Sequence, residues 1–415
     1  MGFPKGRKAI LVIHGIGQQA PFQTLEQFAA GYLKANEWQF NAKDIVLEHR
    51  VSRRTPAFRE PWLESYLRIR PADCESPDVP PDRIDFHEYY WAHQTQRMMT
   101  PVDVFNWFYG VFDRAVKFAR ENHDALAVRD AQQRKDIIKN LDALAVSLAR
   151  WRFFIRPAYW LASWFTRDTV SGRRAWSVFE KLAGVWIAEY AADVAVYTAT
   201  DIKQEHFAVR QQILGGCVER LKNLLGQDDT GRDYNESVVV AAHSLGSVVA
   251  YDAISRLQLF ETKSRLEGPH GHNPLRKLTG FATFGSPLDK IYMYFRDQEN
   301  TTDSERKIRA QFVDQLYNLR LAIPVKAPKP GVANYVSDAR LLAGLRWINY
   351  YHKLDPVSSY LLFYCTDDDV EIEDIPAEYD KFLAAHNGYW FSNAFFQDIH
   401  GRLVCGEASD AAAGE

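Results

Sequence analysis

Residues 238–251 (VVVAAHSLGSVVAY) constrain the fold of this chain more than any other part of the sequence. The run begins with five apolar residues, mostly β-branched, which is typical of a fully buried strand. A helical pattern then covers residues 245–259. A buried strand that passes directly into a helix is typical of the α/β class, in which helices cover both faces of a mostly parallel sheet. Similar apolar runs at residues 8–13, 278–284 and 345–351 support this class.

The turn between this strand and this helix reads AHSLG, with Ser244 at its centre. It matches the nucleophile elbow, G-x-S-x-G, with Ala242 in place of the first glycine. The turn strains the serine backbone, so the residues two before and two after it must be small, as Ala242 and Gly246 are. The backbone N–H of Leu245 would then point at an oxyanion that develops beside the Ser244 hydroxyl. His243 fills the variable position, where packing is its expected role.

An ordinary turn in which Ser244 only caps the helix is the alternative to the elbow. The elbow is favoured because the strand, the small residues and the helix are all in place. A second signal is the glycine turn His14-Gly15-Ile16-Gly17, which follows the apolar residues 8–13. In lipases and esterases with such a turn after an early strand, a backbone N–H of the turn completes the oxyanion hole. That donor would be Ile16 here, with His14, Gly15 and Gly17 supporting the loop. A plain tight turn would show the same four residues.

The remaining members of a catalytic triad follow the nucleophile in the order acid, then histidine. Asp355 comes shortly after the strand expected at residues 345–351, which is where the acid belongs. His386 lies in a loop of small residues, whereas His400 lies near an end that we expect to be frayed, so His386 is the preferred base. The rival acids are grouped in an acidic run that reads as a solvated hairpin or loop over residues 366–374, and they are Asp367, Asp368 and Asp369.

Composition excludes several classes of function. The formal net charge of the 415 residues is -3, so no general basic surface exists for nucleic acid. The 4 cysteines are scattered without metal-ligand spacing, which suits a reducing compartment and predicts a cytoplasmic protein. No stretch is apolar for long enough to suggest a membrane-spanning helix, and the apolar run near the N-terminus is too short for a signal peptide.

Residues 1–100 and 231–405 form the two halves of the expected core, and residues 406–415 form a small, acidic tail expected to be disordered. Between the halves, residues 101–230 are poor in glycine and proline and carry apolar residues at helical spacing, which predicts a large helical insertion or cap. Its tryptophans read first as helix core. A lining for an acyl chain, or a face that contacts a membrane peripherally, is the alternative.

The motifs in order resemble those of lipase-type α/β hydrolases, and more narrowly those of the intracellular DDHD-type phospholipases A1. The similar blocks are HGIGQQ (14–19), AHSLGSVVAYD (242–252), FGSPL (284–288), DPVSSY (355–360) and HNGYWFSNAFFQD (386–398). The resemblance implies a triad of Ser244, Asp355 and His386, and oxyanion donors at Ile16 and Leu245. Ala242 and the unmatched insertion depart from the family pattern.

The family's Asp/His cluster has been viewed as a metal site, for which Asp355, His386 and Asp398 would be the candidates. Because two of these residues serve the triad, we expect no metal and no other cofactor. The sequence therefore predicts a serine hydrolase of carboxylic esters, plausibly lipid or phospholipid acyl esters. The alternatives are a thioesterase or amidase, and a catalytically silent scaffold that binds lipid or protein.

Overall fold

A computed structural model describes residues 3–15, 20–37, 44–51, 65–74, 80–94, 205–227, 230–267, 273–291, 339–355, 357–358, 360–361, 364, 366–380 and 384–407. Most of the expected helical insertion and the expected tail lie outside these residues. The division of the chain into segments at residues 100, 230 and 405 therefore stays a prediction.

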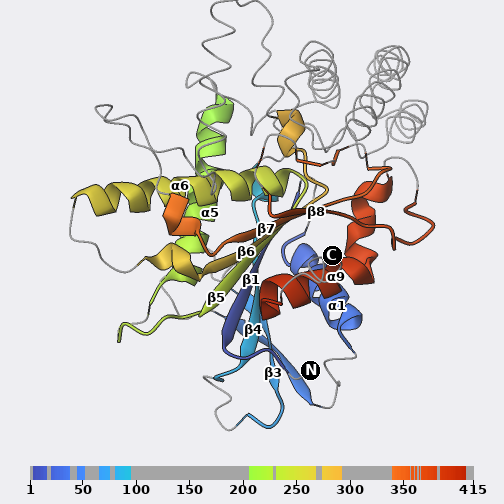
Figure 1. Cartoon of the computed structure of the whole chain (residues 1–415), viewed down its shortest axis with the longest axis horizontal. Coiled ribbons are helices and arrows are strands. Elements are labelled where there is room, and N and C mark those ends of the chain that lie inside the picture. Colours follow the sequence, from blue (N-terminus) through green and yellow to red (C-terminus); the bar gives the residue numbers. More distant parts are fainter. Residues whose placement is uncertain are drawn as a thin grey trace, which may run out of the picture.

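A mixed, mostly parallel sheet of 8 strands forms the centre of the molecule, in the order β2-β3-β4-β1-β5-β6-β7-β8 (Figure 1). The strands are β1 (Arg7–Ile13), β2 (Ile45–Val51), β3 (Ser65–Pro71), β4 (Arg83–Tyr89), β5 (Ser237–His243), β6 (Leu278–Phe284), β7 (Arg346–Tyr351) and β8 (Asp368–Glu371). All neighbours from β4 to β8 pair in parallel, whereas β3 pairs antiparallel with both β2 and β4. The α/β class expected from the sequence is confirmed.

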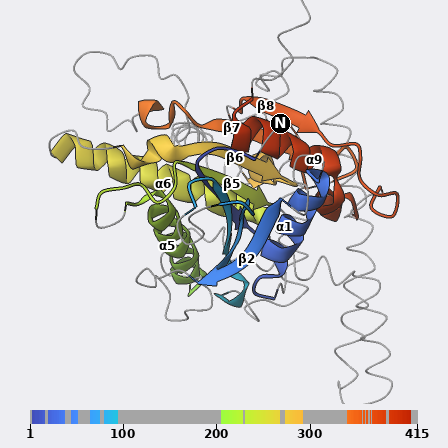
Figure 2. The ribbon, with the colours of Figure 1, turned by 90° about the horizontal axis from the view of Figure 1, so that it is seen from below.

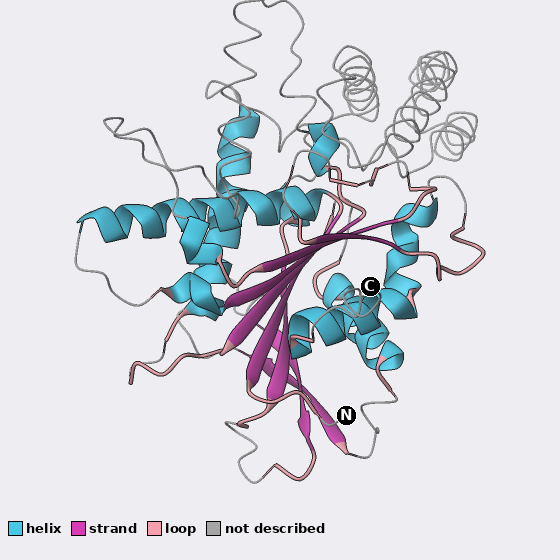
Figure 3. Ribbon diagram, in the orientation of Figure 1, coloured by secondary structure: helices cyan, strands magenta, loops and turns pink. Residues whose placement is uncertain are grey.

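Helices cover both faces of the sheet (Figures 2 and 3). One face carries α5 (Glu205–Leu225) and α6 (Leu245–Glu267), and the other carries α1 (Gln23–Ala35), α9 (Asn393–Asp398) and the π-helical Ile399–Cys405. Although α5 falls within the segment 101–230, it packs beside α6, and Arg210 of α5 pairs with Asp252 of α6 at 3.1 Å. This helix therefore belongs to the layer that covers the sheet.

The apolar strands are buried because both of their faces meet helices. Every residue of β5 is buried, and so is every residue of β1 except Lys8. Among the described helices, none is long and apolar enough to cross a lipid bilayer.

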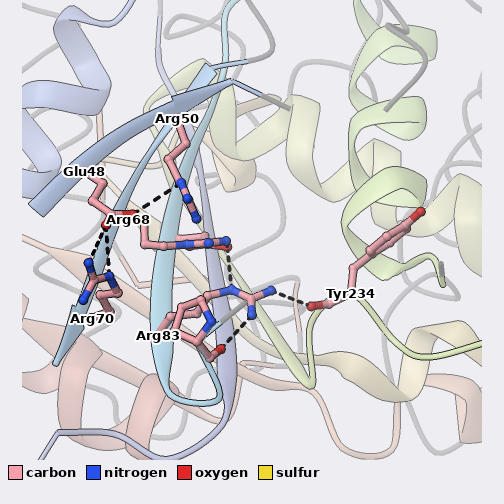
Figure 4. A network of polar contacts seen from close by, with 8 residues as sticks. Glu48, Arg50, Arg68, Arg70, Arg83 and Tyr234 are labelled. Carbon is pink, nitrogen blue, oxygen red and sulfur yellow. Dashed lines mark hydrogen bonds and ion pairs between the residues drawn. The ribbon is translucent and has the colours of Figure 1, made fainter. Parts of the chain in front are cut away.

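Arginine side chains link the antiparallel strands β2 and β3 to each other and to the parallel part of the sheet (Figure 4). Arg68 of β3 donates two hydrogen bonds, of 2.6 and 2.8 Å, to the carboxylate of Asp85 of β4. Arg83 donates to the same carboxylate at 3.0 Å. Arg83 also donates to the carbonyl of Tyr234, just before β5, at 3.0 Å. On the outer strands, Glu48 of β2 accepts from Arg70 of β3 at 2.8 Å. Both oxygens of the buried Asp85 carboxylate therefore accept hydrogen bonds from arginine.

Two expectations about local structure were wrong. The acidic run at residues 366–374 includes strand β8, which pairs in parallel with β7. Its carboxylates serve as acceptors at the sheet edge: Asp369 accepts from the Asn349 amide at 2.7 Å, and Asp368 pairs with Arg402 at 2.9 Å. His400 does not lie in a frayed end, because it is fully buried and its ring bonds to the Tyr32 hydroxyl.

Candidate functional site

Ser244 occupies a sharp turn at the carboxyl end of β5, directly before the first residue of α6. Its φ is 53°, a left-handed conformation that costs a residue with a Cβ atom roughly 1–2 kcal/mol. Two bonds hold the turn in this state. The Ser244 N–H donates to the Phe284 carbonyl at 2.9 Å, and the Ser247 hydroxyl donates to the Ser244 carbonyl at 2.5 Å. The strain that the sequence motif demands is therefore present at Ser244.

The small residues around this turn are required by close contacts with specific neighbours. A Cβ atom on Gly246 would lie 2.6 Å from the Ile13 carbonyl oxygen, at the end of β1. A Cβ atom on Gly15 would lie 2.6 Å from the Cβ of Ser244 and 3.2 Å from its hydroxyl oxygen. The backbone at Gly15 therefore passes directly beside the serine, and only glycine permits that approach. Ala242 is completely buried between β1 and β6.

Asp355 and His386, which are 31 residues apart, meet in the buried interior. The turn after β7 brings Asp355 there, and the 3-10 helix Ala384–Phe391 carries His386. The His386 Nδ1 lies 3.0 and 3.1 Å from the two carboxylate oxygens of Asp355. Since the carboxylate only accepts, the proton in this bond belongs to Nδ1, and Nε2 lies on the opposite side of the ring from Asp355.

Several donors keep the Asp355 carboxylate ionised. Burial raises the pKa of Asp355. The charge of His386 and its hydrogen bond act in the opposite direction, and with two further hydrogen bonds they hold the pKa of Asp355 well below its ordinary value. The Val357 N–H and the Tyr389 hydroxyl each donate to Asp355 at 2.9 Å. Nearby, burial lowers the pKa of Lys290 to about 8, against the attraction of Asp289 and Asp355. An ionised Asp355 is the state that can orient an imidazole and stabilise its protonated form.

Gly285 brings His386 to the elbow. This residue follows β6 with a φ of +60°, and a Cβ atom on it would lie 2.9 Å from the His386 Cε1 and 3.1 Å from the His243 Nε2. Both imidazoles therefore pack directly on the backbone of Gly285, at the end of β6. The preceding residue, Phe284, accepts the bond from the Ser244 N–H. The rings of His243 and His386 lie 4.6 Å apart, centre to centre.

His14 is held by main-chain groups and by the rings of Trp91 and Tyr90. Its Nε2 accepts from the Trp91 N–H at 3.0 Å, and its Nδ1 donates to the Gly15 carbonyl at 2.5 Å. The Trp91 indole stacks on the imidazole at 5.2 Å and donates to the His14 carbonyl at 3.1 Å. Burial lowers the pKa of His14 to about 4, so the ring is neutral and structural.

The residue that precedes α1 provides no side-chain cap for the helix. Phe22 precedes the helix with a φ of 68° and offers no side-chain acceptor. Glu88 of β4 takes that role by accepting from the Phe22 N–H at 2.7 Å. Burial raises the pKa of Glu88 to about 7, although bonds from Phe22 and Thr24 and the charge of Arg220 oppose the rise. The end of β4 and Trp91 thus hold the chain on both sides of residues 16–19.

The other residues expected at the site have different outcomes. Ile16 and Gly17 lie outside the described residues, and Leu245 is the buried first residue of α6. The rival acids serve elsewhere, since Asp367 accepts from the Trp347 N–H at 2.6 Å. Asp398 accepts from the Tyr350 hydroxyl at 2.7 Å and does not join Asp355 and His386. In the described part of the chain, no three His, Cys, Asp or Glu side chains form a group suited to a metal ion.

Sequence reasoning missed Tyr389, Trp91 and Glu88. A signal existed for Tyr389, because it lies three residues after His386 and a 3-10 helix puts such residues on one side. Comparison with known proteins found no match to this chain among family models, curated proteins or solved structures.

Proposed function

We propose that this chain is a serine hydrolase of the α/β-hydrolase fold that cleaves carboxylic esters, with lipid or phospholipid acyl esters as the substrate class. The observation that carries the proposal is Ser244 on a strained strand-to-helix turn, beside a histidine that is hydrogen-bonded to a buried aspartate. This combination is expected of an activated nucleophile, because a serine hydroxyl reacts only when a base takes its proton.

The proposed reaction follows from these positions. His386 removes the proton of Ser244 as its oxygen attacks the ester carbonyl, and Asp355 stabilises the imidazolium that forms. The N–H groups of Leu245 and Ile16 bind the oxyanion. His386 then protonates the leaving alcohol, and water activated by the same ring releases the acid from the acyl-enzyme. The reaction needs no metal or cofactor.

Two features support an ester of a lipid over other acyl compounds. The sequence motifs around Ser244, Asp355 and His386 resemble those of intracellular phospholipases A1. The aromatic helices expected over residues 101–230 would suit an acyl chain or a membrane surface, and peripheral membrane contact through them is part of the proposal.

The test compares hydrolysis of p-nitrophenyl butyrate and p-nitrophenyl palmitate by the wild type, Ser244→Ala and Ser255→Ala. Ser255 is a matched control, since it is also a buried serine, and its hydroxyl donates to the Tyr251 carbonyl inside α6. Loss of turnover by several orders of magnitude in Ser244→Ala alone supports the proposal. A higher rate on palmitate, rising again with micelles, supports the lipid substrate. Equal background rates in all three proteins would contradict it and favour a silent scaffold.

A further inference from the structure

His243 lies between the two halves of the proposed site. It is the last residue of β5 and directly precedes Ser244 in the chain. On one side, its Nε2 lies 3.0 Å from the main-chain carbonyl oxygen of His386. On the other side, its Nδ1 would lie 3.3 Å from a Cβ atom on Gly15. The motif allows many residue types at this position. The specific contact that His243 makes with His386 is therefore not explained by the motif.

The polarity of the bond to His386 defines the state of the His243 ring. A carbonyl oxygen only accepts, so the proton of a neutral His243 resides on Nε2. Burial, together with the nearby His386, holds the pKa of His243 well below its ordinary value. Phe284 and Trp390 enclose the ring at centre distances of 5.0 and 5.1 Å. The imidazole is therefore a neutral donor, held in place by this bond and by the surrounding rings.

The main chain at His386 needs such a tether. Asp355 holds the imidazole at Nδ1, but a ring can keep that bond while its backbone moves and its Nε2 swings away from the serine. His386 belongs to a 3-10 helix, whose hydrogen bonds have poorer geometry than those of an α-helix. The bond from His243 fixes the carbonyl of the same residue, so side chain and main chain are held from opposite ends.

We propose that His243 is a positioning residue, which ties the main chain of His386 to the nucleophile turn and so keeps the Nε2 of His386 in reach of Ser244. This inference rests on the proposed function. The covalent link between His243 and Ser244 makes the tether short, because the residue that bonds to the histidine segment is the direct neighbour of the nucleophile. Errors of about 1 Å between reacting groups can cost about 100-fold in rate.

Two substitutions separate the hydrogen bond from the packing. His243→Phe keeps a ring among Phe284 and Trp390 but removes the donor. His243→Gln loses the ring but offers an amide N–H at a reach similar to that of the imidazole Nε2. We expect kcat of His243→Phe to fall by about 10- to 100-fold with KM within about twofold, because the substitution acts on the position of His386 and not on substrate binding. His243→Gln should recover most of that loss.

The experiment measures kcat and KM on p-nitrophenyl butyrate for the wild type, Ser244→Ala and both His243 variants, with thermal unfolding of each. A purely structural role predicts the opposite order, in which the Gln variant is less stable and less active than the Phe variant. That order, or a Phe variant with the kcat of the wild type, overturns the inference while Ser244-dependent activity stands. If the wild type is no faster than Ser244→Ala, the proposed function fails first and the inference fails with it.

Discussion

The main chain of Ser244 is bonded to that of Phe284, N–H to carbonyl at 2.9 Å, although Ser244 has already left the strand conformation with a φ of 53°. The sheet ladder between β5 and β6 therefore extends one residue into the strained turn. The bond shows how the fold imposes the strain, because relaxing φ at Ser244 would break this contact at the centre of the sheet.

Replacing Ser244 by glycine should therefore stabilise the protein relative to alanine. The left-handed conformation costs alanine roughly 1–2 kcal/mol, and the larger entropy of glycine in the unfolded chain offsets part of the gain. We expect the free energy of unfolding in urea to be about 1 kcal/mol higher for Ser244→Gly than for Ser244→Ala. At Ser255, inside α6, the same pair should show the opposite sign by about 1 kcal/mol. An equal sign at both positions would contradict the strained turn.

Asp355→Asn should lower kcat by about 1,000- to 10,000-fold, since an amide cannot stabilise the protonated imidazole and favours the wrong tautomer. Tyr389→Phe removes one hydrogen bond to the same carboxylate and leaves its charge. Its expected loss is about tenfold or less. Asp369→Asn is the matched control, because this carboxylate bonds to groups other than His386, among them Asn349 and Thr366. Steady-state kinetics on one ester decides the order, and a full-activity Asp355→Asn would remove this residue from the mechanism.

Gly15→Ala should abolish activity and destabilise the fold. The added methyl would lie 2.6 Å from the Cβ of Ser244, and both residues come shortly after the ends of the paired strands β1 and β5, which limit their movement. Gly344→Ala provides the contrast, since a Cβ atom there meets nothing within 4 Å. We expect a loss of about 1–3 kcal/mol at Gly15 and no loss at Gly344. Chemical unfolding of both variants measures the difference, and equal stabilities would mean that the loop is not held against the serine.

Glu88 makes stability depend on pH near neutrality. Its folded pKa of about 7 exceeds the ordinary value of 4.5, so the folded state binds the proton more tightly and loses stability as pH rises from about 4.5 to 7. Glu88→Gln lacks this loss. The stability of the variant minus that of the wild type should therefore rise across that window, by up to about 3 kcal/mol, and stay level above it. Urea unfolding at several pH values between 4 and 8 tests this, and a flat difference would contradict the raised pKa.

The strands that the sequence predicts most clearly are those buried on both faces. A run such as residues 278–284 is typical of a strand covered by helices, and the structure has β6 at those residues. β3 was not foreseen, because SYLRIRP alternates weakly and ends in proline. It pairs with β2 and β4, and its contacts with them include the ion pair of Arg68 with Asp85. The acidic β8 was misjudged for a related reason, since its partner Arg402 comes from a distant helix.

At the candidate site, Ser244 could be predicted from its neighbours, because they form the pattern of a strand followed by a tight turn. The order of residues along the chain then led to Asp355 and His386. The supporting contacts could not be predicted in this way. Nothing beside Trp91 or Glu88 in the sequence indicates that one would hold His14 and the other would cap α1. Such contacts depend on the register between β1 and β4, which aligns Val12 with Glu88 and is fixed only in the folded sheet.

The position of β1 at the centre of the sheet has a consequence for synthesis on the ribosome. β1 pairs with β4 along one edge, and on its other edge Lys8 pairs with Ser237 of β5. During translation the first edge can close once residue 89 has emerged, but the second stays open until β5 has left the exit tunnel. Synthesis proceeds at about 5–20 residues per second, so the apolar β1 waits for seconds with unmatched main-chain groups. Chaperones that bind extended apolar segments would find their target in this interval, and fragments that end before β5 should be caught in it permanently.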